Sequence, residues 1–103
     1  MVKKIIMIGV GVMGAPMAQN LVKKGFDVSV CDANPEALEI FADIATSVST
    51  SPKNEARGRN VIITMLPTSD IVENVLFGDD GAIQSIDKES VIIDMSTASY
   101  QQS

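Results

Sequence analysis

The stretch of sequence that decides the fold is a glycine-rich turn, Gly9-Val10-Gly11-Val12-Met13-Gly14. It follows a run of apolar, mostly β-branched residues, 4–8, and it opens a segment, 13–24, with apolar residues at helical spacing. A G-x-G-x-x-G turn between a strand and a helix favours the binding of a dinucleotide. The first glycine permits a tight turn, the second lets a pyrophosphate approach the backbone, and the third lets the helix pack on the strand. Free N–H groups at the start of the helix attract the phosphates.

Outward from this turn, strand and helix patterns alternate through the chain. We expect strands at 4–8, 27–31, 47–49, 60–65 and 90–95, and helices at 13–24, 34–43, 51–58 and 67–77. Strands that alternate with helices at this spacing form βαβ units with right-handed crossovers. The sequence therefore predicts the α/β class, with a Rossmann-type doubly wound parallel sheet of about five strands and helices on both faces.

Start signals precede three of the expected helices. Asn34 and Ser51 are each followed by proline, which is typical of an N-cap and the first helical position. Asp70 and Glu73 have the spacing of a capping box for the helix that ends at Phe77. The helix at 34–43 is expected to bury Leu38, Phe41 and Ala42.

Asp32 ends the second expected strand, 18 residues after Gly14, close to the spacing of the acidic residue that binds the adenosine ribose in dinucleotide sites. A carboxylate there would repel a 2′-phosphate, and the next residue, Ala33, is not an arginine that could offset the repulsion. We therefore expect NAD as the cofactor rather than NADP. An Asx turn or a helix cap within residues 32–34 is the alternative explanation of Asp32.

Other candidate site residues follow the remaining strands, because ligands of open α/β sheets lie outside the carboxyl ends of the strands. Leu66 and Pro67 are candidates for an apolar wall beside the cofactor, and a plain turn before a helix explains them nearly as well. Ser96 and Thr97 offer hydroxyls for a substrate or a carboxamide, or they cap a following helix. The two readings of Ser96 and Thr97 are equally favoured.

Composition narrows the function classes. The 103 residues suit one domain, and a net charge of −5 gives little electrostatic reason to bind a nucleic acid. Glycines interrupt the apolar stretch behind Lys3 and Lys4, which argues against a signal peptide and a membrane span. The chain has no histidine, the commonest general base and metal ligand. Its one cysteine, Cys31, is expected to be a small core residue. A single cysteine indicates a reducing compartment, and we expect the cytoplasm. Asp79 and Asp80 read as a solvated turn and no metal site is expected.

Three motifs together resemble the β-hydroxyacid dehydrogenase family, which includes 3-hydroxyisobutyrate dehydrogenase, tartronate semialdehyde reductase and, more distantly, 6-phosphogluconate dehydrogenase. The motifs are 8–21 (IGVGVMGAPMAQNL), 64–67 (TMLP) and 94–97 (DMST), and the likeness spans nearly the whole chain. The resemblance implies an NAD-dependent oxidoreductase that moves hydride between nicotinamide and a short 3-hydroxy acid such as 3-hydroxyisobutyrate. It implies that Asp32 takes the ribose, that Leu66 and Pro67 line the cofactor cleft, and that Thr97 lies near the nicotinamide.

The resemblance also implies what residues 1–103 lack. Family members have a substrate-binding Ser-Gly-Gly segment, a catalytic lysine and an all-helical C-terminal domain, so this chain is expected to be the N-terminal portion of the Rossmann domain. We expect no catalytic residue in it, no turnover by it alone, and a homo-oligomer when the protein is full length. The alternatives are a non-catalytic nucleotide-binding or interaction module and a domain for another adenosine ligand, such as S-adenosylmethionine or a flavin. The motif 13–21 argues against the latter.

Overall fold

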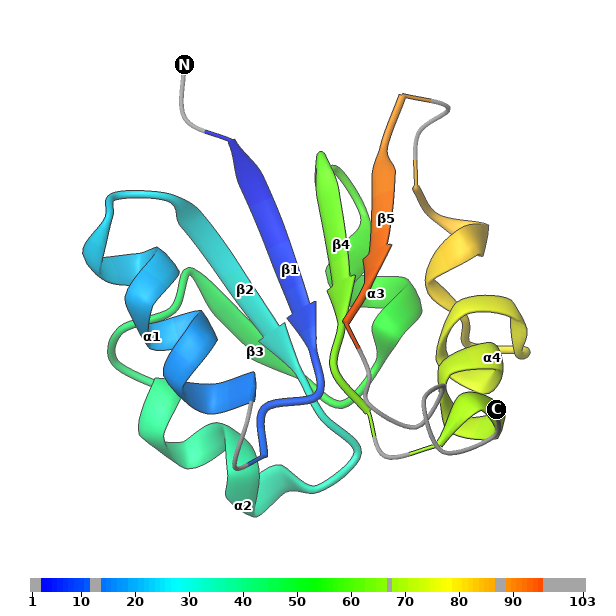
Figure 1. The fold of residues 1–103 in the computed structure, drawn as a ribbon, viewed down its shortest axis with the longest axis horizontal. Helices are drawn as coiled ribbons and strands as arrows, with labels where there is room; N and C mark the ends of the chain where they lie inside the picture. Colours follow the sequence, from blue (N-terminus) through cyan, green and yellow to red (C-terminus); the bar gives the residue numbers. More distant parts are fainter. Residues whose placement is uncertain (1–2, 12–13, 67, 87–88, 96–103) are drawn as a thin grey trace.

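The computed structural model describes residues 3–11, 14–66, 68–86 and 89–95. Parallel strands form one five-stranded sheet in the order β3-β2-β1-β4-β5, which is the Rossmann order (Figure 1). The strands are β1 (Lys4–Ile8), β2 (Asp27–Cys31), β3 (Ser47–Ser49), β4 (Val61–Thr64) and β5 (Val91–Asp94). The helices are α1 (Gly14–Lys23), α2 (Pro35–Leu38), α3 (Pro52–Ala56) and α4 (Ser69–Phe77), with 3-10 turns η1 (Glu39–Phe41) and η2 (Ala82–Gln84). The predicted fold class is confirmed.

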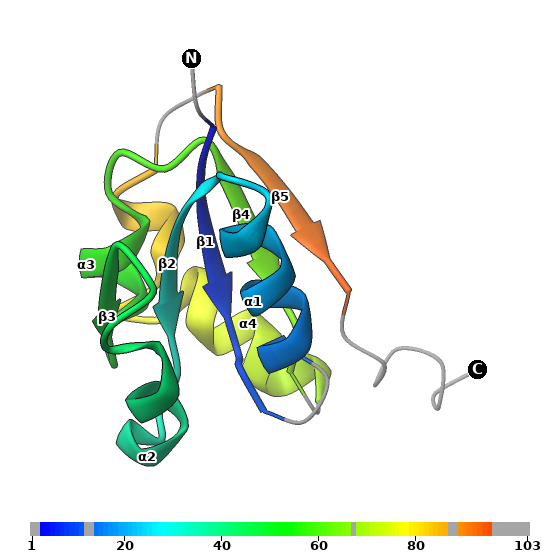
Figure 2. The ribbon, with the colours of Figure 1, turned by 90° about the vertical axis from the view of Figure 1, so that its left-hand side faces the viewer.

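The sheet has a core on each face, because successive side chains of a strand point to opposite sides. Met7 of β1 packs with Ala18 of α1 and Phe41 of η1 on one face. Ile6 packs with side chains of α3 and α4 on the other. Figures 1 and 2 show the helices on both sides of β1. In the described part of the chain, no helix is long and apolar enough to cross a membrane.

Two local expectations are wrong. The helix at 34–43 ends its regular part at Leu38 and continues as the 3-10 turn η1, so that Leu38 and Phe41 are buried but Ala42 is exposed. The tighter 3-10 winding rotates Ala42 away from the sheet. The cap of α4 is Thr68, whose Oγ1 accepts from the N–H of Ile71 at 3.2 Å. Asp70 therefore lies inside the helix and forms no capping box with Glu73.

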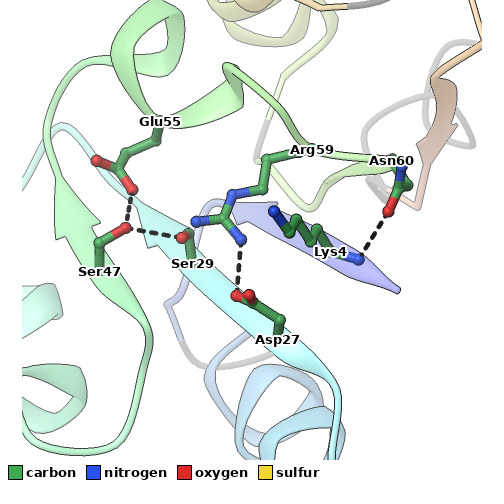
Figure 3. Close-up of polar contacts among 7 residues, drawn as sticks. All are labelled: Lys4, Asp27, Ser29, Ser47, Glu55, Arg59 and Asn60. Carbon is green, nitrogen blue, oxygen red and sulfur yellow. Dashed lines mark hydrogen bonds and ion pairs between the residues drawn. The ribbon is translucent and has the colours of Figure 1, made fainter. Parts of the chain in front are cut away.

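Polar contacts join the strands toward their amino ends (Figure 3). The N–H of Lys4 donates to Oδ1 of Asn60 at 2.9 Å, which ties the start of β1 to the residue before β4. Arg59 and Asp27 form an ion pair at 2.7 Å, with the Arg59 side chain 11% exposed. These contacts therefore lie at the end of the sheet opposite to the carboxyl ends of the strands.

A second polar group ties β2 and β3 to α3 in the same region (Figure 3). The buried Ser29 hydroxyl meets that of Ser47 at 2.8 Å, and Ser47 donates to Oε1 of Glu55 at 2.5 Å. Because a buried hydroxyl without a partner is costly, this chain of contacts accounts for serine in the middle of a buried strand.

Candidate functional site

A cleft of about 670 Å³ lies at the carboxyl ends of β1, β2 and β4. Its walls include five of the predicted site residues, Gly9, Gly11, Gly14, Asp32 and Leu66. They come from segments that are distant in sequence and are brought together by the pairing of β1 with both neighbouring strands. The cleft is large enough for a drug-sized or cofactor-sized ligand, since such pockets span about 300–1,000 Å³.

The glycine turn at the base of the cleft is built as the sequence indicates. Gly9 has φ +97°, and a Cβ there would lie 2.3 Å from the carbonyl oxygen of Met65. A Cβ on Gly14 would lie 2.1 Å from the carbonyl oxygen of Gly9, so only glycine lets α1 approach the turn. A Cβ on Gly11 meets no atom within 4 Å. Gly11 lines the cleft, so the cleft is open at this position.

Asp32 stands where β2 ends, and backbone N–H groups hold both of its carboxylate oxygens. Val10 N–H donates to Oδ2 at 2.9 Å and Asn34 N–H donates to Oδ1 at 2.9 Å. The second contact is the Asx turn that was the alternative explanation of Asp32. It does not compete with ligand binding, because two carboxylate oxygens offer about four acceptor positions. The side chain of Val10 itself lies in the core, 3% exposed.

The cleft is also lined by residues that were not predicted as site residues from the sequence. They are Ile8, Cys31, Ala33, Thr50, Pro52, Met65, Ile71, Asn74, Val75 and Asp80. Thr50 directly follows β3 and Pro52 begins α3, so the position of ligands at the carboxyl ends of strands is the sequence signal for both residues.

Asp80, expected in a solvated turn, has no such signal. The Ser51 hydroxyl donates to its Oδ1 at 2.9 Å, and Lys53 N–H donates to its carbonyl oxygen at 3.0 Å. These two contacts bring the turn after α4 against the start of α3 and so place Asp80 on the cleft wall.

Cys31 lies beside Asp32 but is 1% exposed. Burial, with smaller contributions from the carboxylates of Glu55, Asp32 and Asp80, raises the pKa of its thiol to about 12. A thiol that stays protonated is a poor nucleophile, so Cys31 is a core residue, as expected.

Several predicted site residues lie outside the described residues: Val12, Met13, Pro67, Ser96 and Thr97. Asp94, which comes two residues before Ser96 in the sequence and ends β5, accepts from the buried Thr64 hydroxyl at 2.9 Å. Within the described ranges, no group of three or more His, Cys, Asp or Glu residues is placed to hold a metal ion.

Comparison with known proteins identifies the family. The family model described as the NAD binding domain of 6-phosphogluconate dehydrogenase matches residues 4–103. The chain belongs to this family. The NAD-binding domain is 42% identical over 93 residues to 3-sulfolactaldehyde reductase of Escherichia coli, covering 90% of the chain and 31% of the relative. It is 37% identical over 95 residues to an NAD-dependent L-serine dehydrogenase of Pseudomonas aeruginosa, covering 92% and 32%.

A solved structure agrees with the sequence relatives. The NAD-binding domain superposes on 3-hydroxyisobutyrate dehydrogenase of Mycobacterium tuberculosis, determined with L-serine, with a TM-score of 0.86 and 33% identity. The match covers 95% of this chain and 33% of that chain. The predicted relationship to the β-hydroxyacid dehydrogenases is confirmed. The chain spans about a third of the length of the relatives it matches.

Proposed function

We propose that the cleft binds NAD and that the chain is the cofactor-binding part of an oxidoreductase acting on a short 3-hydroxy acid such as 3-hydroxyisobutyrate. The observation that carries the proposal is the open space at Gly11, in a cleft that is also lined by Gly14, the first residue of α1. A helix N-terminus and unpaired backbone N–H groups attract an anion, and a glycine without Cβ lets a diphosphate reach them. When bound, nicotinamide supplies the hydride acceptor or donor.

The charge of the cleft supports NAD over NADP. Asp32 and Asp80 both line it, and no lysine or arginine is among its described lining residues. A 2′-phosphate near Asp32 would meet like charge without a cation to offset it. The free acceptor positions of Asp32 suit the two hydroxyls of an unphosphorylated ribose.

The substrate and the proton-transfer group belong to the rest of the proposed enzyme. None of the lysines in the described ranges lines the cleft, so we assign no catalytic residue to this chain and expect no turnover by it alone. An all-helical C-terminal domain, a catalytic lysine and a homo-oligomer are part of the proposal, as the family resemblance implies. The named substrates of the relatives, a sulfolactaldehyde, a hydroxyisobutyrate and serine, support a small polar substrate.

Isothermal titration calorimetry of the chain with NAD, NADP and S-adenosylmethionine tests the cofactor assignment. We expect NAD to bind more tightly than NADP and S-adenosylmethionine not to bind. Tighter binding of NADP overturns the reading of Asp32, and failure of both dinucleotides overturns the proposed function.

Turnover is tested on the longest polypeptide that carries this domain. Serine, 3-hydroxyisobutyrate, glycerate and 3-hydroxypropionate are each supplied with NAD, and NADH formation is followed. We expect reduction of NAD with at least one of them. Binding of NAD without turnover of any hydroxy acid would instead favour a non-catalytic nucleotide-binding module.

A further inference from the structure

The turn between β1 and α1 is attached to the end of β2 by two successive N–H groups. Gly9 N–H donates to the carbonyl oxygen of Cys31 at 2.8 Å, as in a strand ladder. Val10 N–H, the next donor, reaches a side chain instead, Oδ2 of Asp32 at 2.9 Å. The carboxylate thus continues the pairing of the two strands one step beyond their backbone ladder, which ends at the pair Ile8 and Cys31.

In the described part of the chain, Val10 N–H donates to the Asp32 carboxylate and to no other group. The residue is 3% exposed and its side chain belongs to the core cluster beneath α1. A buried N–H group without an acceptor costs about 1–3 kcal/mol, so loss of the Asp32 carboxylate penalises this conformation of the turn. A hydrogen bond to an ionised acceptor is stronger than one to a carbonyl.

The other carboxylate oxygen fixes the position of Asp32. Oδ1 accepts from the backbone N–H of Asn34 at 2.9 Å, a bond in which the Asn34 side chain takes no part. Asp32 is therefore held between the glycine turn and the start of α2 before any ligand binds. Its remaining acceptor positions are still free for ribose hydroxyls.

We propose that Asp32 is a positioning residue for the diphosphate as well as a contact for the ribose. By holding Val10 N–H, it sets the shape of the glycine turn in which Gly11 and Gly14 line the cleft. The N–H of Val10 is then not a phosphate donor. The proposal rests on the proposed function. The Asp32 carboxylate would then act on the diphosphate of NAD through the turn and on the adenosine ribose by direct contact.

A thermodynamic cycle separates the two effects. The Kd values of NAD, and of an NAD analogue without the two adenosine ribose hydroxyls, are measured for the wild-type chain and for Asp32→Ala. If Asp32 positions the turn, Asp32→Ala raises the Kd of the analogue by about ten-fold or more, as expected for the loss of a hydrogen bond to a charged acceptor. If the substitution raises the Kd of NAD but leaves the Kd of the analogue unchanged, Asp32 contacts the ribose alone and the positioning role is overturned.

Amide hydrogen exchange of the ligand-free chain provides a second readout, which does not depend on NAD. Asp32→Ala should speed the exchange of Val10 N–H by about ten-fold or more while leaving that of Met7, in the middle of β1, unchanged. Equal acceleration of both amides would mean general loosening of the fold and would overturn the proposal.

The matched control is Asn34→Ala, at the same junction. It removes the side-chain cap on Glu36 and leaves the bond between Val10 and Asp32 in place. We expect the exchange of Val10 and the affinity for the analogue to stay at wild-type values, and a change as large as that of Asp32→Ala would count against the proposed route. If the wild-type chain binds no NAD, the proposed function fails, whereas the exchange of Val10 still reports on the hydrogen bond.

Discussion

Gly11 and Gly14 lie three residues apart, but a side chain would meet opposite surroundings at the two positions. At Gly14 an added Cβ would overlap the backbone of Gly9, at 2.1 Å from its carbonyl oxygen. At Gly11 it would meet open space, and the φ angle of Gly11 is not positive, so a side chain there is not strained. One glycine therefore serves packing and the other serves access to the cleft.

These surroundings predict that two identical substitutions separate stability from binding. Gly14→Ala should lower the free energy of unfolding by about 1–3 kcal/mol or more, because backbone atoms must move. Gly11→Ala should change the free energy of unfolding by about 0.5 kcal/mol or less. It should lower the affinity for NAD, since the new methyl group stands in the cleft. Urea unfolding and calorimetry measure the two quantities. A Gly11→Ala chain that binds NAD normally would contradict the assignment of the turn to a diphosphate.

At the scale of elements, the ion pair of Asp27 and Arg59 joins the start of β2 to the connection before β4 (Figure 3). The Thr46 side chain and then Arg59 hydrogen-bond the Asp27 carboxylate and lower its pKa from the usual 3.8. Because the folded-state pKa is the lower one, the stabilisation is complete above the unfolded value and is lost as pH falls through the folded value.

Stability should therefore fall as the pH is lowered below about 4, in part through Asp27. Asp27→Asn should reduce the free energy of unfolding at pH 7 by about 1 kcal/mol or less, as is typical of a pair near the surface, and should flatten the acid limb of the pH profile. Urea unfolding from pH 7 to pH 3 measures this. The control is Asp43→Asn, at an exposed position outside the pair, and an equal flattening by both variants would argue against a special role of Asp27.

The element order could be read from the sequence because apolar runs, prolines and glycines mark it locally. The details that failed depend on contacts that are not local. The regular part of α2 ends at Leu38, and the 3-10 turn that follows buries Phe41 in the core and leaves Ala42 exposed. The start of α4 depends on the extended backbone of Thr68, which competes with Asp70 for the cap.

The candidate site divides in the same way. Gly9, Gly11, Gly14 and Asp32 belong to a motif with fixed spacing, and the structure brings them to one cleft. Asp80 reaches the cleft only through hydrogen bonds to residues 51 and 53, almost thirty positions earlier in the chain. No local pattern in the sequence reports contacts of this kind.

At the scale of the whole molecule, β5 forms one edge of the sheet, and the described residues leave its apolar side chains partly exposed. In β5, Val91, Ile92 and Ile93 are 53%, 36% and 41% exposed, although their sequence is typical of a strand buried on both faces. Among the described residues, no strand pairs with the outer edge of β5.

An apolar strand edge with free backbone groups recruits other chains. We therefore expect the chain by itself to self-associate with rising concentration, and Ile93→Lys to shift it toward the monomer. Sedimentation velocity over a range of concentrations measures the association. Ile44→Lys is the matched control. Ile44 is apolar and 44% exposed, and it lies three residues before β3, the strand at the opposite end of the strand order from β5. An equal effect of both variants would show that added charge, and not the strand edge, controls the association.

The central place of β1 in the sheet has a consequence for how the chain is made. β1 is synthesised before the other four strands of the sheet, and β2 can pair with one of its edges soon afterwards. Its other edge needs β4, and Lys4 and Asn60, which join these strands, are 56 residues apart. At about 5–20 residues per second, the ribosome takes roughly 3–11 s to cover that distance. During this time the apolar segment Ile5–Ile8 has one edge without a partner strand, and unpaired strand edges of partly folded chains are prone to aggregate.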